Sequence, residues 1–112
     1  MKLTDDEIKE LYQHFKHVIN YESDNPSDPI DPLTYEAPDE DNCLHIASRR
    51  GNYRAAELLL KSGIDINKKG DMGDTALHWA YRMKHHDIVK LLLKHGASNE
   101  ILNEFRSKPS DY

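Results

Sequence analysis

The sequence predicts an all-α fold in which short helix pairs stack into a solenoid. Three observations point to it: a repeat with a period of 33 residues, apolar side chains at helical spacing within each repeat, and five glycines confined to residues 51–96. A chain of 112 residues has the size of one small domain. We divide this single domain, residues 1–112, into a capping helix (1–19), an acidic proline-rich connection (20–41), two repeats (42–73 and 74–106) and a truncated cap (107–112).

The first segment, residues 3–19, is predicted to be an amphipathic helix. Its apolar residues recur three and four positions apart: Ile8, Leu11, Tyr12, Phe15, Val18 and Ile19. Thr4 and Glu7 have the spacing of a capping box, which satisfies amide groups at a helix start. Because repeat arrays need polar end caps, we expect this helix to cover the first repeat through Leu11, Tyr12, Phe15 and Ile19.

The connection at residues 20–41 breaks the helical period. It holds four of the five prolines and eight acidic residues, without Lys or Arg. Residues 1–41 carry a net charge of −9 and residues 42–112 a net charge of +4, which gives −5 overall. Two interpretations stay open: a solvated linker, or a capture segment for a basic partner through Asp24, Asp28 and Asp31. A chain-wide basic footprint for nucleic acid or membrane is missing.

The repeat itself aligns residues 41–66 with residues 74–99. Ten of these 26 positions are identical, where average composition gives about one or two. Each repeat is predicted to hold a short first helix (43–50 and 76–83) followed by a second helix (54–61 and 87–94). Gly63 and Gly96 stand where a left-handed residue ends a helix.

The segment Thr75-Ala76-Leu77-His78-Trp79-Ala80 resembles the Thr-Pro-Leu-His-x-Ala signature of the ankyrin repeat family. Asn42 to Ala47 repeats the pattern, and Lys108 to Tyr112 is similar to a frayed third unit. Cys43 and Ala76 replace the signature proline. Lys84 stands where the first repeat has Gly51, so we expect a strained or lengthened turn there. The resemblance implies that His45 and His78 hydrogen-bond the backbone of neighbouring loops.

Catalytic and metal-binding motifs are absent from the sequence. It lacks the nucleotide-binding glycine loops, the His-Glu-x-x-His zinc motif and the nucleophile elbow. Cys43 is the only cysteine, which excludes an internal disulfide; at a helix start it is either a reactive thiol or, as we favour, a small packed residue. We therefore predict no enzyme activity, metal or cofactor. The chain has neither a secretory signal nor a membrane-spanning run, so we expect a cytoplasmic location.

The ankyrin resemblance implies protein binding through a concave surface. Arg, Met and aromatic residues are enriched at interface cores, although the bland interpretation of these positions is a solvated helix edge. Trp79 is either a binding anchor or a larger core residue. We assign Arg49, Arg50, Arg82 and Met83 to the helices of this surface, Asp39, Met72 and Phe105 to its hairpin tips, and Lys69, Asp71 and Glu104 to positions beside the tips.

These observations lead to a functional hypothesis: a non-enzymatic module that binds and occludes a partner protein. By its size and acidity the chain is similar to short bacterial ankyrin proteins that act as immunity partners of toxins. The alternative is a scaffold or adaptor that links proteins without inhibiting them. We expect a complete chain and a basic partner, such as a toxin or an enzyme that handles nucleic acid. We also expect a monomer, or weak self-association through Met72, Met83 and Phe105 when unbound.

Overall fold

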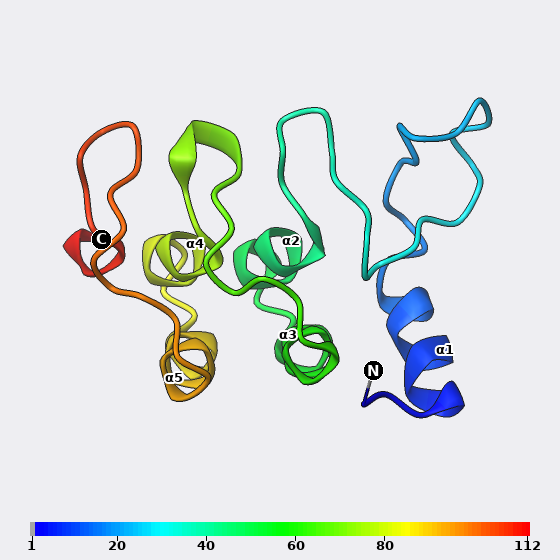
Figure 1. Cartoon of the computed structure of the whole chain (residues 1–112), viewed down its shortest axis with the longest axis horizontal. Coiled ribbons are helices and arrows are strands. Elements are labelled where there is room, and N and C mark those ends of the chain that lie inside the picture. The colour runs from blue at the N-terminus through cyan, green and yellow to red at the C-terminus, as the bar shows by residue number, and fades with distance from the viewer. Residues whose placement is uncertain (1) are drawn as a thin grey trace.

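The computed structural model describes residues 2–112 as a row of stacked helices. Figure 1 shows α2 and α4 in one layer, α3 and α5 in a second layer, and three loops that project from the same side of the stack. Within residues 2–112 the only β-pairing is an isolated bridge between Glu36 and Asn42, so the predicted all-α class is confirmed. The elements are α1 (Asp5–His14), α2 (Cys43–Arg50), α3 (Tyr53–Ser62), α4 (Ala76–Arg82), α5 (His86–Lys94), and the 3-10 turns η1 (Asp71–Gly73) and η2 (Pro109–Asp111).

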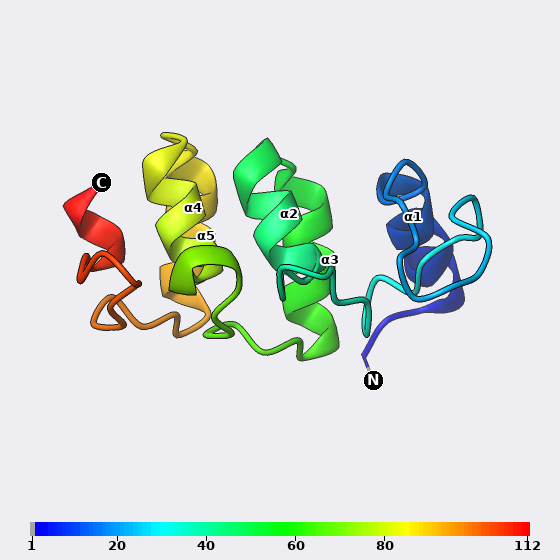
Figure 2. The same cartoon turned by 90° about the horizontal axis from the view of Figure 1, so that it is seen from above.

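The helices of the two repeats begin and end within one residue of the predicted bounds. The side chain of Asn42 accepts the backbone N–H groups of Leu44 and His45 and so caps α2. Gly63 ends α3 with a φ of 87°, in the left-handed region that glycine adopts without strain. Viewed from above, α2 lies beside α3, and α4 beside α5 (Figure 2). Local capping and helix-stop signals therefore set the length of each helix.

The turn between α4 and α5 is strained, as the sequence predicts. Lys84 has a φ of 63°, which is the left-handed region that Gly51 occupies in the first repeat with a φ of 75°. At Gly51 a side chain is excluded as well, because a Cβ there would lie 2.6 Å from the imidazole of His85. His85 instead donates from Nε2 to the carbonyl of Arg49 at 3.2 Å, which joins the second repeat to the end of α2.

The core is a continuous layer of aliphatic side chains between the helices. Its centre comes from the predicted set, all of it at most 6% exposed: Leu44, Leu58, Leu59, Leu77, Ala80, Val89, Leu91 and Leu92. Burial of such side chains contributes about 1.5–3 kcal/mol each, which offsets the cost of ordering the short helices. The first helices α2 and α4 pack on each other directly. Stacking therefore supplies the apolar surface that one helix pair lacks.

The N-terminal cap is shorter than the sequence predicts. α1 ends at His14 rather than near Ile19, and Phe15 is its C-cap residue. Leu11 and Phe15 are buried, whereas Tyr12 is 37% and Ile19 50% exposed, so these two expected packing contacts are wrong. The backbone N–H of Val18 bonds to the carbonyl of Phe15, which turns the chain away from the helix axis. The predicted capping box of Thr4 and Glu7 is present.

α1 covers α3 by crossing it, as Figures 1 and 2 show together. Two sets of ion pairs accompany this packing. Lys61 of α3 contacts Glu7 at 2.8 Å, and Arg54 contacts Glu10 at 2.7 Å. α1 therefore takes the place of a preceding outer helix.

The acidic connection between α1 and α2 folds into a series of turns. Ile30 and Tyr35 are buried, and the Tyr35 hydroxyl donates to the carbonyl of Ile19 at 2.8 Å. Asp28 accepts a hydrogen bond from the Ser23 hydroxyl, and Asp31 accepts the backbone N–H of Leu33. Asp24, Asp28 and Asp31 are all exposed. Short polar side chains thus order this loop locally and leave its charge at the surface.

Candidate binding surface

An Asp–Arg pair recurs at the same place in both repeats. Arg49 Nη1 lies 3.0 Å from Asp41 Oδ2, and Arg82 Nη1 lies 2.8 Å from Asp74 Oδ2. Arg82 also donates from Nη2 to Asp74 Oδ1 at 3.1 Å, so this pair is bidentate. The carboxylates of Asp41 and Asp74 are 3% and 2% exposed. Each arginine therefore compensates a buried negative charge inside its own repeat.

The same arginines form a ladder with two aromatic rings. Trp79 lies between them, with its ring centroid 4.9 Å from Arg49 Cζ and 4.8 Å from Arg82 Cζ. Arg82 Cζ also lies 4.3 Å from the ring centroid of Tyr112. Such cation–π contacts contribute about 0.5–2 kcal/mol each. The half-buried indole of Trp79 thus joins the two repeats. Whether Trp79 is a binding anchor or a core residue, its ring also packs between these two arginines.

The remaining predicted helix positions lie beside this ladder and face solvent. Arg50 is exposed and its guanidinium has no ion pair among residues 2–112. Met83 is 45% exposed at the C-cap of α4. Of the four predicted positions on these helices, Arg49 and Arg82 therefore stabilise the stack, and Arg50 and Met83 are available to a partner.

The predicted hairpin tips stand in a row along one edge of the stack. Met72 is 48% and Phe105 63% exposed, and Asp39 is exposed at the equivalent place in the first loop. Adjacent loops are hydrogen-bonded to each other: Asp71 N–H donates to Asp41 Oδ1 and Glu104 N–H to the Met72 carbonyl, both at 2.9 Å. Beside the tips, Lys69 and Glu104 are exposed and Asp71 is half-buried.

The tips share a backbone conformation that the sequence pattern did not reveal. Glu40, Gly73 and Arg106, which are 33 residues apart, have φ values of 75°, 73° and 60°. Two non-glycine residues thus hold a left-handed conformation at equivalent loop positions, each stabilised by the hydrogen bonds of its loop. The row of tips is therefore preorganised before any partner binds.

Two buried histidines fix the loops onto the helices. Nδ1 of His45 accepts the backbone N–H of Asn42 at 2.9 Å, and Nδ1 of His78 accepts that of Thr75 at 3.0 Å. An accepting Nδ1 places the proton on Nε2, which donates to the carbonyl of Lys68 in one case and of Ser107 in the other. Both bonds reach the following loop, as the family resemblance implied. Burial lowers the pKa of both imidazoles.

Acid is expected to weaken the fold through these histidines. Each has a lower pKa when folded than its ordinary value of 6.5, so the unfolded chain binds more protons below that pH. The stabilisation is complete above about pH 6.5 and is lost as the pH falls through the lowered pKa. Urea unfolding at pH 7 and pH 5 measures the loss. It should be smaller in the His78→Asn variant, and an equal loss in both proteins would contradict the assignment.

The structure bears on two of the predicted absences, a reactive cysteine and a metal site. Cys43 is fully buried, and burial raises the pKa of its thiol to about 12, so it packs as a small apolar residue. Residues 2–112 contain no group of three His, Cys, Asp or Glu side chains placed to hold a metal ion. None of the helices described is both long and apolar enough to cross a bilayer.

Stacked helix pairs with projecting loops define the class of solenoid repeat proteins. Comparisons with known proteins identify the family within this class. The model of the family described as ankyrin repeats (3 copies) matches residues 7–103. The chain therefore belongs to the ankyrin repeat family, and its class is that of protein–protein interaction modules.

Known relatives match about three fifths of this chain. Human ankyrin repeat domain-containing protein 40 is 38% identical over 68 residues, which are 60% of this chain and 18% of that protein. Human protein phosphatase 1 regulatory subunit 27 is 37% identical over 68 residues, 61% of this chain and 44% of that protein. A putative ankyrin repeat-containing protein of Treponema pallidum is 39% identical over 70 residues, 62% of this chain and 23% of that protein. The chain thus spans less than half the length of each of these relatives.

Proposed function

We propose that this chain is a non-enzymatic module that binds a partner protein through its hairpin tips and the exposed ends of α2 and α4. The observation that carries the proposal is the preorganised row of tips, with Met72 and Phe105 exposed on hydrogen-bonded neighbouring loops. Rigid exposed apolar and aromatic side chains are typical anchors of an interface, since little conformational entropy is lost when they are buried. Arg50 and Met83 extend the surface onto the helices.

The proposed consequence of binding is occlusion of the partner. A relative that is a regulatory subunit of a phosphatase supports a regulatory rather than a passive role. Neutralisation of a toxin is the narrower form of this proposal and rests on the size and acidity of the chain. The alternative is a scaffold or adaptor, which the occurrence of similar repeats as 18% of a longer relative supports. We place the module in the cytoplasm, since its single cysteine is buried and unpaired.

Truncation of the tips should weaken capture of the partner strongly. The Met72→Ala/Phe105→Ala variant removes both apolar anchors, and we expect a loss of about 2 kcal/mol or more, roughly 30-fold in Kd. The measurement is a pull-down from native extract with the intact chain, followed by calorimetry on the captured protein. Leu93→Ala is the matched control, because Leu93 is 42% exposed on α5, away from the tips. Binding that survives the double variant but fails in the control would contradict the assigned surface.

The acidic connection is proposed to speed the encounter with a basic partner. Replacing Asp24, Asp28 and Asp31 by Asn removes three charges but keeps an oxygen acceptor for Ser23 and Leu33, so the loop retains its turns. Complementary charge raises the association rate and is screened over about 8–10 Å at working salt. Stopped-flow kinetics should therefore show slower association and a flatter salt dependence. Unchanged association at low salt would leave the segment as a linker.

A further inference from the structure

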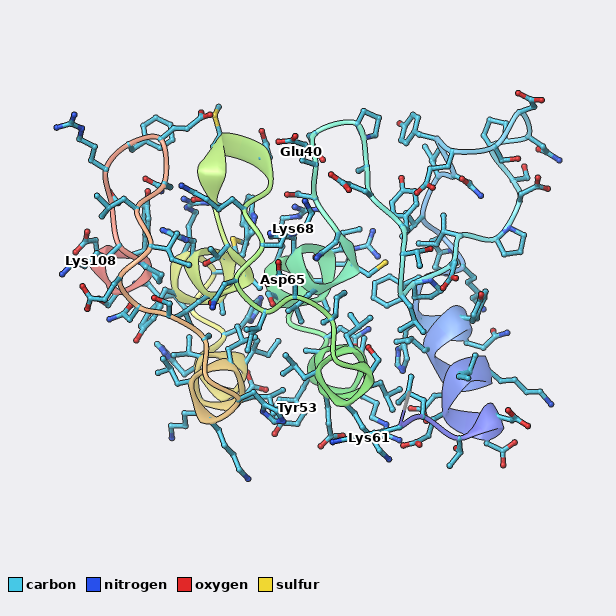
Figure 3. The ribbon with its side chains drawn as sticks, viewed as in Figure 1. Glu40, Tyr53, Lys61, Asp65, Lys68 and Lys108 are labelled. Carbon is cyan, nitrogen blue, oxygen red and sulfur yellow. The ribbon has the colours of Figure 1, made fainter. Side chains whose placement is uncertain are left out.

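A groove of about 1010 Å³ lies on the outer face of the stack, on the side opposite the hairpin tips. One face of α3 and one face of α5 form its walls, with side chains at spacings of three and four residues. Figure 3 shows Tyr53 between α3 and α5, and Lys61 on the other flank of α3. Tyr53, which is 40% exposed, and the half-buried Leu60 supply apolar surface within the groove, and the buried core residues Leu58 and Leu91 lie beneath it.

The two walls differ in whether their basic side chains form ion pairs within the molecule. On α3, Arg54 pairs with Glu57 and with Glu10 of α1, and Lys61 pairs with Glu7. Hydrogen bonds from Lys61 and from the backbone N–H of Thr4 lower the pKa of Glu7 to about 2. This carboxylate therefore stays ionised and paired with Lys61. The positive charge of the α3 wall is therefore compensated from within the molecule.

The α5 wall presents two lysines without such partners. Lys90 and Lys94 are exposed, and neither has a carboxylate within ion-pair distance among residues 2–112. Asp87 lies at the start of the same helix face, and its Oδ1 accepts a hydrogen bond from the backbone N–H of Ile88 at 2.8 Å. The end of the groove formed by Lys90 and Lys94 is thus positively charged and available to an anionic group.

The spacing of Lys90 and Lys94 along α5 matches the spacing of alternate side chains in an extended peptide. Four residues along a helix correspond to a rise of about 6 Å. Alternate side chains of an extended peptide lie on one face and are about 6.6 Å apart. We propose that the groove binds an extended acidic segment of a partner protein, with carboxylates at alternate positions that pair with Lys90 and Lys94. This site is separate from the hairpin tips and does not depend on the function proposed for them.

The acids at the lips of the groove favour a discrete peptide over a polyanion. Glu57 and Asp87 line the same hollow, and a continuous phosphate backbone would pass both carboxylates. A segment with two carboxylates can place them on the lysines and its remaining side chains on Tyr53 and Leu60. Proteins that bind single-stranded nucleic acid commonly stack successive bases on several aromatic side chains, whereas Tyr53 and the imidazole of His95 are the aromatic rings in the lining of this groove.

The test uses a fluorescein-labelled eight-residue peptide of alternating Glu and Ala, with an alternating Gln and Ala peptide as its uncharged counterpart. The full chain should bind the first and not the second, with affinity that falls as salt rises. The Lys90→Glu/Lys94→Glu variant should lose about tenfold or more in affinity. Lys9→Glu/Lys16→Glu, exposed on and just after α1, makes the same change in net charge and should bind normally. Circular dichroism verifies that both variants are folded.

Other outcomes would overturn the inference. Equal losses in both lysine variants would mean a net-charge effect, and tighter binding of oligodeoxythymidine would mean a nucleic-acid surface. Self-association of the intact chain that sedimentation detects and the Lys90→Glu/Lys94→Glu variant abolishes would make the occupant the acidic connection of a second copy. The Met72→Ala/Phe105→Ala variant should still bind the peptide, which separates a failure of this site from a failure of the hairpin-tip surface.

Discussion

The Arg82→Ala variant is expected to lose about 3–5 kcal/mol of unfolding free energy. The substitution leaves the carboxylate of Asp74, which is 2% exposed, without its bidentate partner. Among residues 2–112, the amide of Asn103 is the one side chain that would still donate to this carboxylate. The Arg82→Ala substitution also removes the cation that lies between the rings of Trp79 and Tyr112. Such a loss is a large fraction of the stability of a small domain.

A double-mutant cycle separates the buried charge from the lost packing. Asp74→Ala/Arg82→Ala removes both partners, so it should be more stable than Arg82→Ala alone. Arg82→Lys keeps the charge but cannot form the planar two-bond contact, and it should fall between the intact chain and Arg82→Ala. Trp79 is the only tryptophan, so its fluorescence reports unfolding in urea directly beside the substituted residue. A loss below about 1 kcal/mol would show that water compensates Asp74.

The Leu77→Ala variant is expected to lose about 2–5 kcal/mol, the range for truncation of a buried leucine. Leu77 is 1% exposed in the layer where α4 packs on α2, so its truncation leaves a cavity between these two helices. Leu59 on α3 is fully buried and should show a loss in the same range. Thermal and urea unfolding measure the effect. Leu93→Ala, at 42% exposure, is the control, and a loss there as large as at Leu77 would contradict the assigned core.

Most of the helical architecture could be predicted because each helix carries its own start and stop signals. Asn42 and Thr75 cap the first helices, and Gly63 ends α3, so local chemistry determined these bounds. The end of α1 could not be predicted in this way. Ile19 continues the apolar period, but a period does not say which turn of the helix meets a partner surface, and the chain leaves the helix after Phe15.

The candidate surface was predictable by position but not by contact. The repeat alignment already contained Asp41 and Asp74 at one position and Arg49 and Arg82 at another, eight residues along. That recurrence was the available signal for the buried ion pairs. The contact of Trp79 with Arg49 depends on how closely two repeats stack, which no spacing along the chain gives. The outer groove arises in the same way, from the distance between α3 and α5.

The two ends of the stack are attached by different kinds of interaction. At the N-terminal end, two ion pairs of Glu7 and Glu10 join α1 to α3, together with a hydrogen bond between His14 and Asn52 at the start of α3. At the C-terminal end, the final loop is held by a buried hydrogen bond of Asp74 with Asn103 and a partly buried one of His78 with Ser107. Stacks of this kind lose structure unit by unit from an end, and ionic strength weakens the exposed ion pairs of α1 more than the hydrogen bonds of Asp74 and His78. Fraying is therefore expected to start at α1 and its acidic connection, so the end with the most negative charge is also the end with the most freedom to adapt to what it meets.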